Sequence, residues 1–130
     1  MSYRILVADD EKDIVASLQK CLLREGYLVS VAFDGEEALL RVKEDNPDIV
    51  LLDLMMPKRN GFEVLQAIRK DFKDKWRPVI IISGQADLDS VKKGYALEAD
   101  HYLTKPVTME VILHGVQTMI SLIPLRRDNE

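Results

Sequence analysis

Five short apolar runs, separated by longer segments in which apolar residues recur at helical spacing, constrain most strongly how this chain folds. The runs occupy residues 4–8, 28–32, 48–52, 78–82 and 101–104. Such an alternation is typical of βαβ units, in which helices cover both faces of a parallel sheet. The sequence therefore predicts an α/β fold.

The segments between these runs carry the start and stop signals of helices. Helices are predicted at about 11–24, 36–44, 61–72, 88–97 and 107–122. Asp34 and Asp87 stand where an N-cap residue belongs, and Gly26 follows the first helix as a stop signal. Because Pro124 follows the last helix, we expect one folded domain over residues 1–123 and a polar tail or linker stub over residues 124–130.

Composition narrows the class of protein. With 130 residues, of which 47% are hydrophobic and 31% charged, the chain has the size and balance of one globular domain. Its net charge of −4 provides no general attraction to nucleic acid or to an anionic membrane. The single cysteine, Cys21, cannot form an internal disulfide, and we expect it to be a buried structural thiol. The sequence contains no signal peptide or membrane-spanning run, so a cytoplasmic location without a membrane partner is expected.

Polar residues follow four of the five runs directly. They are Asp9 and Asp10 after the first run, Asp53 after the third, Ser83 after the fourth and Lys105 after the fifth. In an open parallel sheet, ligands bind outside the carboxyl ends of the strands, where the strand order reverses. We therefore expect three carboxylates, a hydroxyl and an ammonium group to converge at one edge of the sheet.

These residue types suit phosphoryl transfer. An aspartate carboxylate is a nucleophile that forms an acyl phosphate, and the rest of the reaction depends on positioning and charge neutralisation. Three crowded carboxylates would repel one another and raise their pKa values unless a cation lies among them. Magnesium prefers such carboxylates together with water and phosphate oxygens, and a lysine adds a second positive charge. The cluster therefore predicts a Mg²⁺ site.

In order and spacing, these residues resemble the receiver domain of response regulators in bacterial two-component signalling, the CheY-like superfamily. The matching positions are Asp9 and Asp10, Asp53, Ser83, and Lys105 with Pro106. The stretch 53–61 is similar to the signature loop of that family, although Asn60-Gly61 stands where Asp-Gly is commoner. Glu98 is a second departure, because it replaces the usual glycine before the fifth strand, where a positive φ is expected.

The resemblance covers essentially the whole chain and implies a flavodoxin-like, doubly wound (βα)5 fold with five parallel strands in the order 2-1-3-4-5. It also implies that Asp53 is the phosphoacceptor. Asp10, Asp53 and the backbone carbonyl of Met55 would ligate Mg²⁺, and Asp9 would belong to the metal site through a bound water. The domain would be a signalling switch rather than an enzyme, assisting only its own phosphorylation and dephosphorylation.

Ser83, Lys105 and Tyr102 would complete the switch. The first two would hold phosphate oxygens, and the Lys105-Pro106 bond would be cis. On phosphorylation the Ser83 hydroxyl would move toward the phosphate and the Tyr102 ring would turn inward. The face formed by the fourth helix, fifth strand and fifth helix would then shift and control a partner or an output domain. The phosphoryl donor would be a sensor histidine kinase or a histidine-phosphotransfer protein.

Two other functions use a sheet of this kind. A haloacid-dehalogenase-type phosphatase also has an aspartyl nucleophile and Mg²⁺, but its DxD motif needs an acid where Met55 follows Asp53 by two residues. A flavodoxin-like nucleotide binder needs Ser, Thr and Gly after the first strand to cradle a phosphate. Carboxylates stand there instead, so both alternatives fit the sequence less well than a receiver domain.

The final helix is poor in charge. Apart from Glu110, no formally charged residue occurs between residues 107 and 123. One apolar stripe is predicted to pack on the sheet and comprises Met109, Ile112, Leu113, Val116, Ile120 and Ile123. A second, mostly apolar face comprises Val111, Gly115, Thr118, Met119 and Leu122. We expect this second face to contact a second copy of the chain or an output domain, and we expect no direct binding of nucleic acid.

Overall fold

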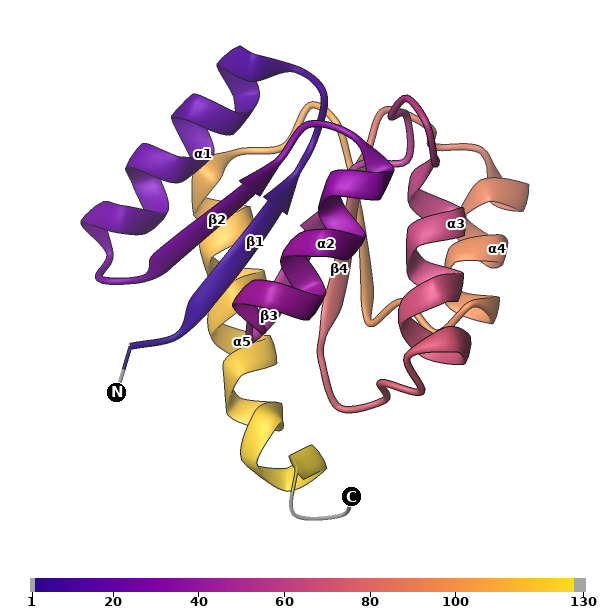
Figure 1. Cartoon of the computed structure of the whole chain (residues 1–130). Coiled ribbons are helices and arrows are strands. Elements are labelled where there is room, and N and C mark those ends of the chain that lie inside the picture. Colours follow the sequence, from indigo (N-terminus) through magenta and orange to yellow (C-terminus); the bar gives the residue numbers. More distant parts are fainter. Residues whose placement is uncertain (1, 128–130) are drawn as a thin grey trace.

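A five-stranded parallel sheet runs through the centre of the protein (Figure 1). The computed structural model describes residues 2–127. The strands are β1 (Arg4–Ala8), β2 (Leu28–Ala32), β3 (Ile49–Leu52), β4 (Val79–Ser83) and β5 (His101–Thr104). Their order in the sheet is β2-β1-β3-β4-β5, which confirms the predicted topology and places the reversal of strand order between β1 and β3.

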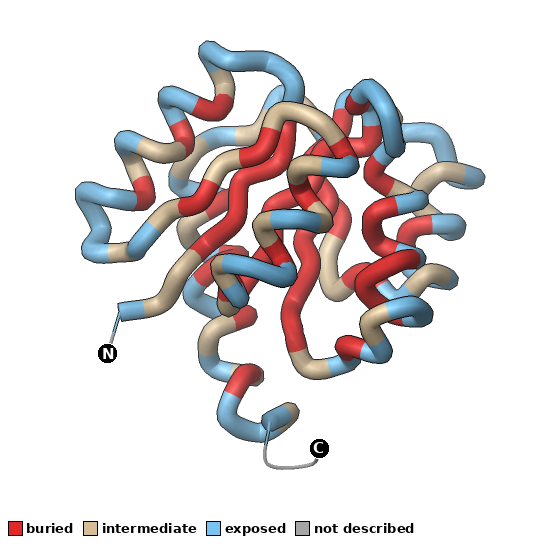
Figure 2. The backbone as a smooth tube through the Cα atoms, viewed as in Figure 1, coloured by how far each residue is buried: buried red, intermediate tan, exposed pale blue. Residues whose placement is uncertain are grey.

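Helices cover both faces of the sheet (Figure 1). On one face lie α1 (Lys12–Arg24) and α5 (Met109–Arg127); on the other lie α2 (Gly35–Asp45), α3 (Gly61–Gln66) with the π-helical turn η1 (Ala67–Asp71), and α4 (Leu88–Ala96). Two apolar clusters fill the spaces between these helices and the sheet. Figure 2 shows the same arrangement, with buried strands in the interior and helices that expose one side to solvent.

Alternating residues of the strands contribute to these two clusters. In β1, Leu6 and Ala8 belong to the cluster under α2, α3 and α4, whereas Ile5 and Val7 belong to the cluster under α1 and α5. Every residue of β3 and β4 is buried. Because these central strands are covered on both faces, they form continuous apolar runs in the sequence.

The helices begin at residues that satisfy free backbone N–H groups. The Asp34 carboxylate accepts a hydrogen bond from the first turn of α2 at 2.8 Å, and Asp87 does the same for α4 at 2.9 Å. Both predicted N-caps are therefore confirmed. Asn60 and Glu63 form a capping box at the start of α3.

The backbone differs from the prediction in the third helix and agrees with it before the fifth strand. The segment predicted as one helix at 61–72 divides into α3 and η1, because the latter adopts π-helical hydrogen bonding. Glu98 has a φ of 72°, as expected where the receiver pattern has glycine. The Nε–H of Arg69 donates to the Glu98 carbonyl at 3.1 Å, and this bond helps to hold the turn.

The last helix is longer than predicted. It does not end before Pro124 but continues to Arg127. Two ion pairs hold its final turn: Arg126 lies 2.5 Å from Asp100, and Arg127 lies 3.2 Å from Asp48. Among residues 2–127, no helix combines the length and the apolar character needed to cross a bilayer.

The structure also corrects the predicted division of α5 into two faces. Ile112 and Val116 are buried, as expected, but Gly115 and Met119, which were predicted on the outer face, are buried as well. Val111 of that outer face is 47% exposed. The predicted apolar contact surface is therefore smaller than the sequence pattern indicated, because the sheet and α1 together cover a wide arc of this helix.

Candidate functional site

The carboxyl edge of the sheet brings together residues that are far apart in the sequence. Asp9 follows β1 and Asp53 follows β3, and the last residues of these two strands are paired in register, so the two aspartates are neighbours. Ser83 ends β4, and its carbonyl accepts a hydrogen bond of 2.8 Å from the N–H of Lys105, which follows β5. All four residues thus lie at one edge, as the strand pattern predicted.

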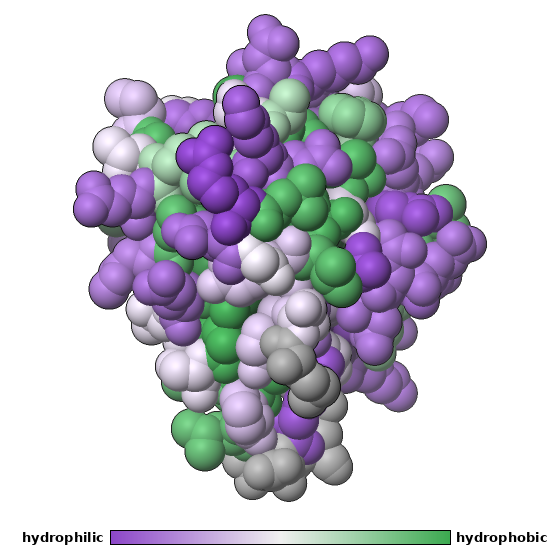
Figure 3. Space-filling view, turned by 90° about the vertical axis from the view of Figure 1, so that its left-hand side faces the viewer, coloured by the Kyte–Doolittle hydropathy of each residue, from purple (hydrophilic) through white to green (hydrophobic). Residues whose placement is uncertain are grey.

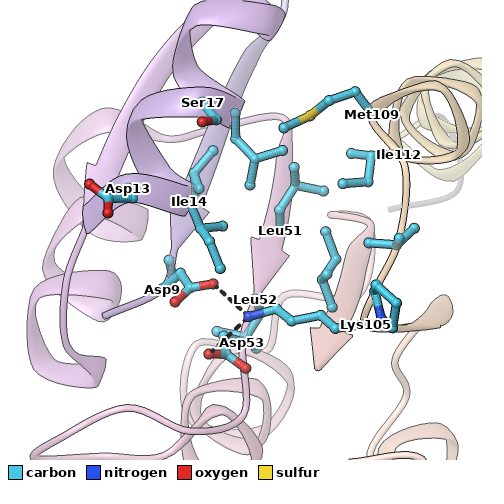
Figure 4. A pocket seen from close by; sticks show the side chains of 16 residues that line it. Asp9, Asp13, Ile14, Ser17, Leu51, Leu52, Asp53, Lys105, Met109 and Ile112 are labelled. Atoms are coloured by element: carbon cyan, nitrogen blue, oxygen red, sulfur yellow. Dashed lines mark hydrogen bonds and ion pairs between the residues drawn. The ribbon is translucent and has the colours of Figure 1, made fainter. Parts of the chain in front are cut away.

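The Lys105 ammonium group lies between the two aspartates (Figure 4). Its Nζ atom is 3.0 Å from Oδ2 of Asp9, 3.6 Å from Oδ2 of Asp53 and 3.6 Å from Oε1 of Glu11. Burial by itself would lower the pKa of Lys105, but the hydrogen bond with Asp9 and the charges of the carboxylates raise it. Lys105 is therefore a fixed positive charge at neutral pH. The Lys105-Pro106 bond is cis, as the family resemblance implied.

One lysine does not balance the acidic residues. Asp9, Asp10 and Asp53 each place a carboxylate oxygen within 4.8 Å of the others. Asp53 is 5% exposed. Burial, together with the charge of Asp9, raises the pKa of Asp53 to about 6, although Lys105 and backbone N–H groups act in the opposite direction. The cluster is therefore deficient in positive charge.

Mg²⁺ fits this set of donors. The ion prefers hard oxygen ligands in an octahedron that includes waters, and the three carboxylates present such oxygens close together. Asp9 and Asp53 are buried, whereas Asp10 is exposed, so water ligands can reach the cluster from the side of Asp10. A divalent cation here would also remove the repulsion that raises the pKa of Asp53.

The loop between β3 and α3 packs tightly against Asp53. The Gly61 N–H donates to the Leu54 carbonyl at 3.0 Å, and a Cβ atom on Gly61 would overlap the Asp53 carbonyl oxygen. A residue without a side chain is therefore needed at this position. Met55 is 59% exposed, and its N–H donates to Oδ1 of Asp53 at 3.4 Å. The loop thus holds Met55 beside the Asp53 carboxylate.

Gln85, two positions after Ser83, connects several parts of the site. Its N–H donates to Oγ of Ser83 at 3.2 Å, and its carbonyl accepts a hydrogen bond of 2.5 Å from the Tyr102 hydroxyl. Its side chain donates to Sδ of Met55 at 3.0 Å and accepts from the Ser90 hydroxyl of α4 at 3.2 Å. Gln85 therefore links the end of β4, Tyr102 of β5, the β3–α3 loop and α4.

A largely apolar cleft of about 610 Å³ opens beside the site, between α1 and α5. Asp9, Asp53 and Lys105 lie at one end of it, and Ile14 of α1 and Ile112 of α5 contribute to its walls (Figure 4). Figure 3 shows hydrophobic side chains gathered near the middle of the molecular face that carries α1, with hydrophilic side chains around them. The charged residues thus adjoin a surface of apolar character.

Residues 5–117 match the family described as the response regulator receiver domain. The chain belongs to this family. Receiver domains are signalling modules of two-component response regulators rather than classical enzymes, and they generally bind Mg²⁺ at an acidic pocket. The family assignment therefore agrees with the acidic cluster at the carboxyl edge of the sheet.

Similar proteins support this assignment. The response regulator MprA of Mycobacterium ulcerans (strain Agy99) is 35% identical over 128 residues, which are 98% of this chain and 54% of MprA, so the chain spans about half the length of that relative. A CheY-like receiver domain protein from Methanospirillum hungatei JF-1 superposes with a TM-score of 0.88 at 25% identity, covering 100% of both chains. The chemotaxis protein CheY4 of Vibrio cholerae gives a TM-score of 0.85 at 28% identity, covering 92% of this receiver domain and 99% of CheY4.

Proposed function

We propose that this receiver domain is a switch that accepts a phosphoryl group on Asp53 with the help of Mg²⁺. The position of Asp53 supports the proposal most directly, because this buried carboxylate lies at the reversal of strand order with Lys105 and two further carboxylates around it. In the reaction, an Asp53 oxygen attacks the phosphorus of a phosphohistidine on the donor protein. The bond between phosphorus and the histidine nitrogen breaks, and an acyl phosphate forms on Asp53.

The metal ligands in this proposal come from the acidic cluster and the loop after β3. Asp10, Asp53 and the backbone carbonyl of Met55 would hold the ion, and Asp9 would act through a bound water. Bound Mg²⁺ would supply positive charge to the equatorial oxygens of the transferred group. The raised pKa of Asp53 supports this assignment, since it reflects the charge deficit that a cation corrects.

Ser83, Lys105 and Tyr102 carry the response in this proposal. Lys105 binds a phosphate oxygen as a point charge, and the Ser83 hydroxyl donates a hydrogen bond to a second one. The Tyr102 ring is already buried against the sheet, with its hydroxyl bonded to the loop before α4. Movement of Ser83 and Tyr102 would alter the face formed by α4, β5 and α5.

The donor in this proposal is a sensor histidine kinase or a histidine-phosphotransfer protein, and the reaction takes place in the cytoplasm. The apolar cleft between α1 and α5 supports the docking of such a protein, because it leads to Asp53. The output is control of a partner, an output domain or a second copy through the α4-β5-α5 face. Leu88, Tyr95 and Val111 expose apolar surface there, at 66%, 47% and 47%.

Phosphorylation by acetyl phosphate tests the proposal. Mass spectrometry of the wild-type chain with Mg²⁺ should show incorporation of a phosphoryl group, and removal of Mg²⁺ with a chelator should abolish it. Asp53→Asn should abolish incorporation because the amide is not a nucleophile. Asp87→Asn is the matched control, since Asp87 also carries a carboxylate after β4 but serves as the N-cap of α4. Undiminished incorporation in Asp53→Asn would contradict the assignment.

A further inference from the structure

The backbone of α4 contacts the Tyr102 ring at Gly94. Gly94 is buried on the inner side of this helix. A Cβ atom at this position would lie 3.0 Å from Cδ1 of Ile81 and 3.1 Å from Cδ2 of Tyr102. Both distances are shorter than the roughly 3.5–4.0 Å at which carbon atoms normally meet. The helix can therefore lie this close to the ring because residue 94 has no side chain.

The other end of Tyr102 is held by the loop that precedes α4. The Tyr102 hydroxyl donates to the Gln85 carbonyl at 2.5 Å, and the Gln85 N–H donates to Oγ of Ser83 at 3.2 Å. The Gln85 side chain also accepts a hydrogen bond from Ser90 in the first turn of α4. Tyr102 is thus tied to α4 twice, through its ring at Gly94 and through its hydroxyl at Gln85.

The two side chains that face Gly94 differ in their freedom to move. Ile81 belongs to β4, lies inside the sheet and is 0% exposed. Tyr102 belongs to the edge strand β5 and is 8% exposed. A side chain at position 94 would therefore push the Tyr102 ring outward or push α4 away from the sheet. Either movement would separate the Tyr102 hydroxyl from Gln85.

We propose that Gly94 is a positioning residue for the switch. It leaves the space in which the Tyr102 ring lies when turned inward, and it makes the position of α4 depend on the position of that ring. The proposal rests on the proposed function, in which Ser83 and Tyr102 respond to phosphorylation. A movement of Ser83 toward the phosphoryl group would then displace Gln85 and Tyr102, and through them the backbone of α4.

Gly94→Ala tests this proposal, and Gly115→Ala is its matched control. Gly115 is also a buried glycine inside a helix, in α5. A Cβ atom on Gly115 would meet Ile80 and His101 at 3.7 and 3.8 Å, which is ordinary contact. The two substitutions raise helix propensity by the same amount, but the first places an atom against the Tyr102 ring.

The experiment has two readouts on the full chain. The first is the aromatic NMR resonances of Tyr102, assigned with Tyr102→Phe; the second is the affinity for beryllofluoride, a phosphoryl mimic, in the presence of Mg²⁺. Gly94→Ala should move the ring resonances toward those of an exposed tyrosine and weaken beryllofluoride binding about tenfold. Gly115→Ala should leave both unchanged. In a Tyr102→Ala background, Gly94→Ala should reduce the affinity much less, because only the close contact with Ile81 remains.

Unchanged ring resonances and affinity in Gly94→Ala would overturn the proposal, as would a loss of affinity that is equally large without the ring. If Gly94→Ala prevents folding, Tyr102→Ala in the same chain should restore it, and failure to do so would count against the proposal. A wild-type chain that does not bind beryllofluoride with Mg²⁺ would contradict the proposed function. The ring resonances of unliganded Gly94→Ala would still decide the role of Gly94.

Discussion

At the scale of single residues, the acidic site is marked by the unfavourable charge of Asp53. Burial and the neighbouring Asp9 raise its pKa to about 6, even though Lys105 opposes this shift from 3.6 Å away. An unfolded chain would have an aspartate pKa of about 3.9. The folded chain therefore favours the protonated form of Asp53 more than the unfolded chain does, and a bound cation would offset the same unfavourable charge.

This difference in pKa predicts how stability depends on pH. Because the folded-state pKa of Asp53 is the higher one, the contribution is favourable below about pH 4 and is lost as the pH rises through about 6. Asp53→Asn has no carboxylate at this position, so this pH-dependent contribution to stability is absent from the variant. Its advantage in the free energy of unfolding over the wild type should therefore grow between pH 4 and 7, to about 2 kcal/mol.

Urea unfolding of both chains in the presence of a chelator measures this advantage across the pH range. Added Mg²⁺ should stabilise the wild type more than Asp53→Asn and so narrow the gap, since the ion needs the carboxylate. A gap that is the same at pH 4 and pH 7 would show that the charge of Asp53 is not destabilising.

At the scale of the elements, α5 shows how packing can depart from an amphipathic pattern. The helix is apolar on more than one side, and its pattern alone does not say which sides are covered. In the structure Met119 is 9% exposed and Val111 is 47% exposed, although the sequence placed both on the outer face. The positions of β3, β4 and α1 around the helix decide this, because their side chains occupy the arc next to Met119.

Substitution of these two residues by glutamate should therefore have different effects. Met119→Glu would bury a charge without a partner, which should lower the free energy of unfolding by about 3 kcal/mol or more. Val111→Glu lies at the surface and should change it by less than about 0.5 kcal/mol. Chemical denaturation compares the two. Equal effects would indicate that α5 packs differently.

The Val111→Glu variant also tests the predicted contact of α5 with a second copy of the chain. If a second copy binds the exposed side of this helix, sedimentation should show self-association that Val111→Glu weakens. A chain that remains monomeric at high concentration, with and without beryllofluoride, would leave an output domain or another protein as the partner of this face.

At the scale of the whole molecule, a buried ion pair and a partly exposed one hold the edge of the sheet opposite the acidic site. Arg69, which is 3% exposed, lies 3.0 Å from Asp100. The same carboxylate accepts a hydrogen bond from the Val79 N–H at 2.8 Å and pairs with Arg126 at the end of α5. Asp100 therefore joins η1, β4, β5 and α5 at one point.

Loss of this carboxylate should destabilise the fold. Asp100→Ala would leave the Arg69 charge buried without its partner and should lower the free energy of unfolding by about 3–5 kcal/mol. Lys75→Ala is the control, because Lys75 pairs with Glu98 nearby but both side chains are more than half exposed, at 55% and 54%. That change should cost less than about 1 kcal/mol. Similar losses in the two variants, measured by urea unfolding, would argue against a structural role for Asp100.

Much of this architecture can be predicted from local patterns. The five apolar runs became the five strands, and Asp34 and Asp87 cap helices as predicted. The carboxyl-edge position of Asp9 and Asp53 follows from the parallel arrangement of the strands, whereas the strand order was implied by the resemblance to receiver domains. The π-helical turn Ala67–Asp71 had no such local signal and was not predicted.

The sequence by itself determined the fold class, the family and the residues gathered at the acidic edge, because strand and helix periods and the residues that end each strand are local properties of the chain. Tertiary structure alone decided which residues support the site and the fold through contacts between elements. Gln85 and Gly94 act through Tyr102, which is 17 and 8 positions away in the sequence. Asp100 acts through Arg69, which is 31 positions away. Such contacts depend on how whole elements pack, and no periodicity along the chain records them.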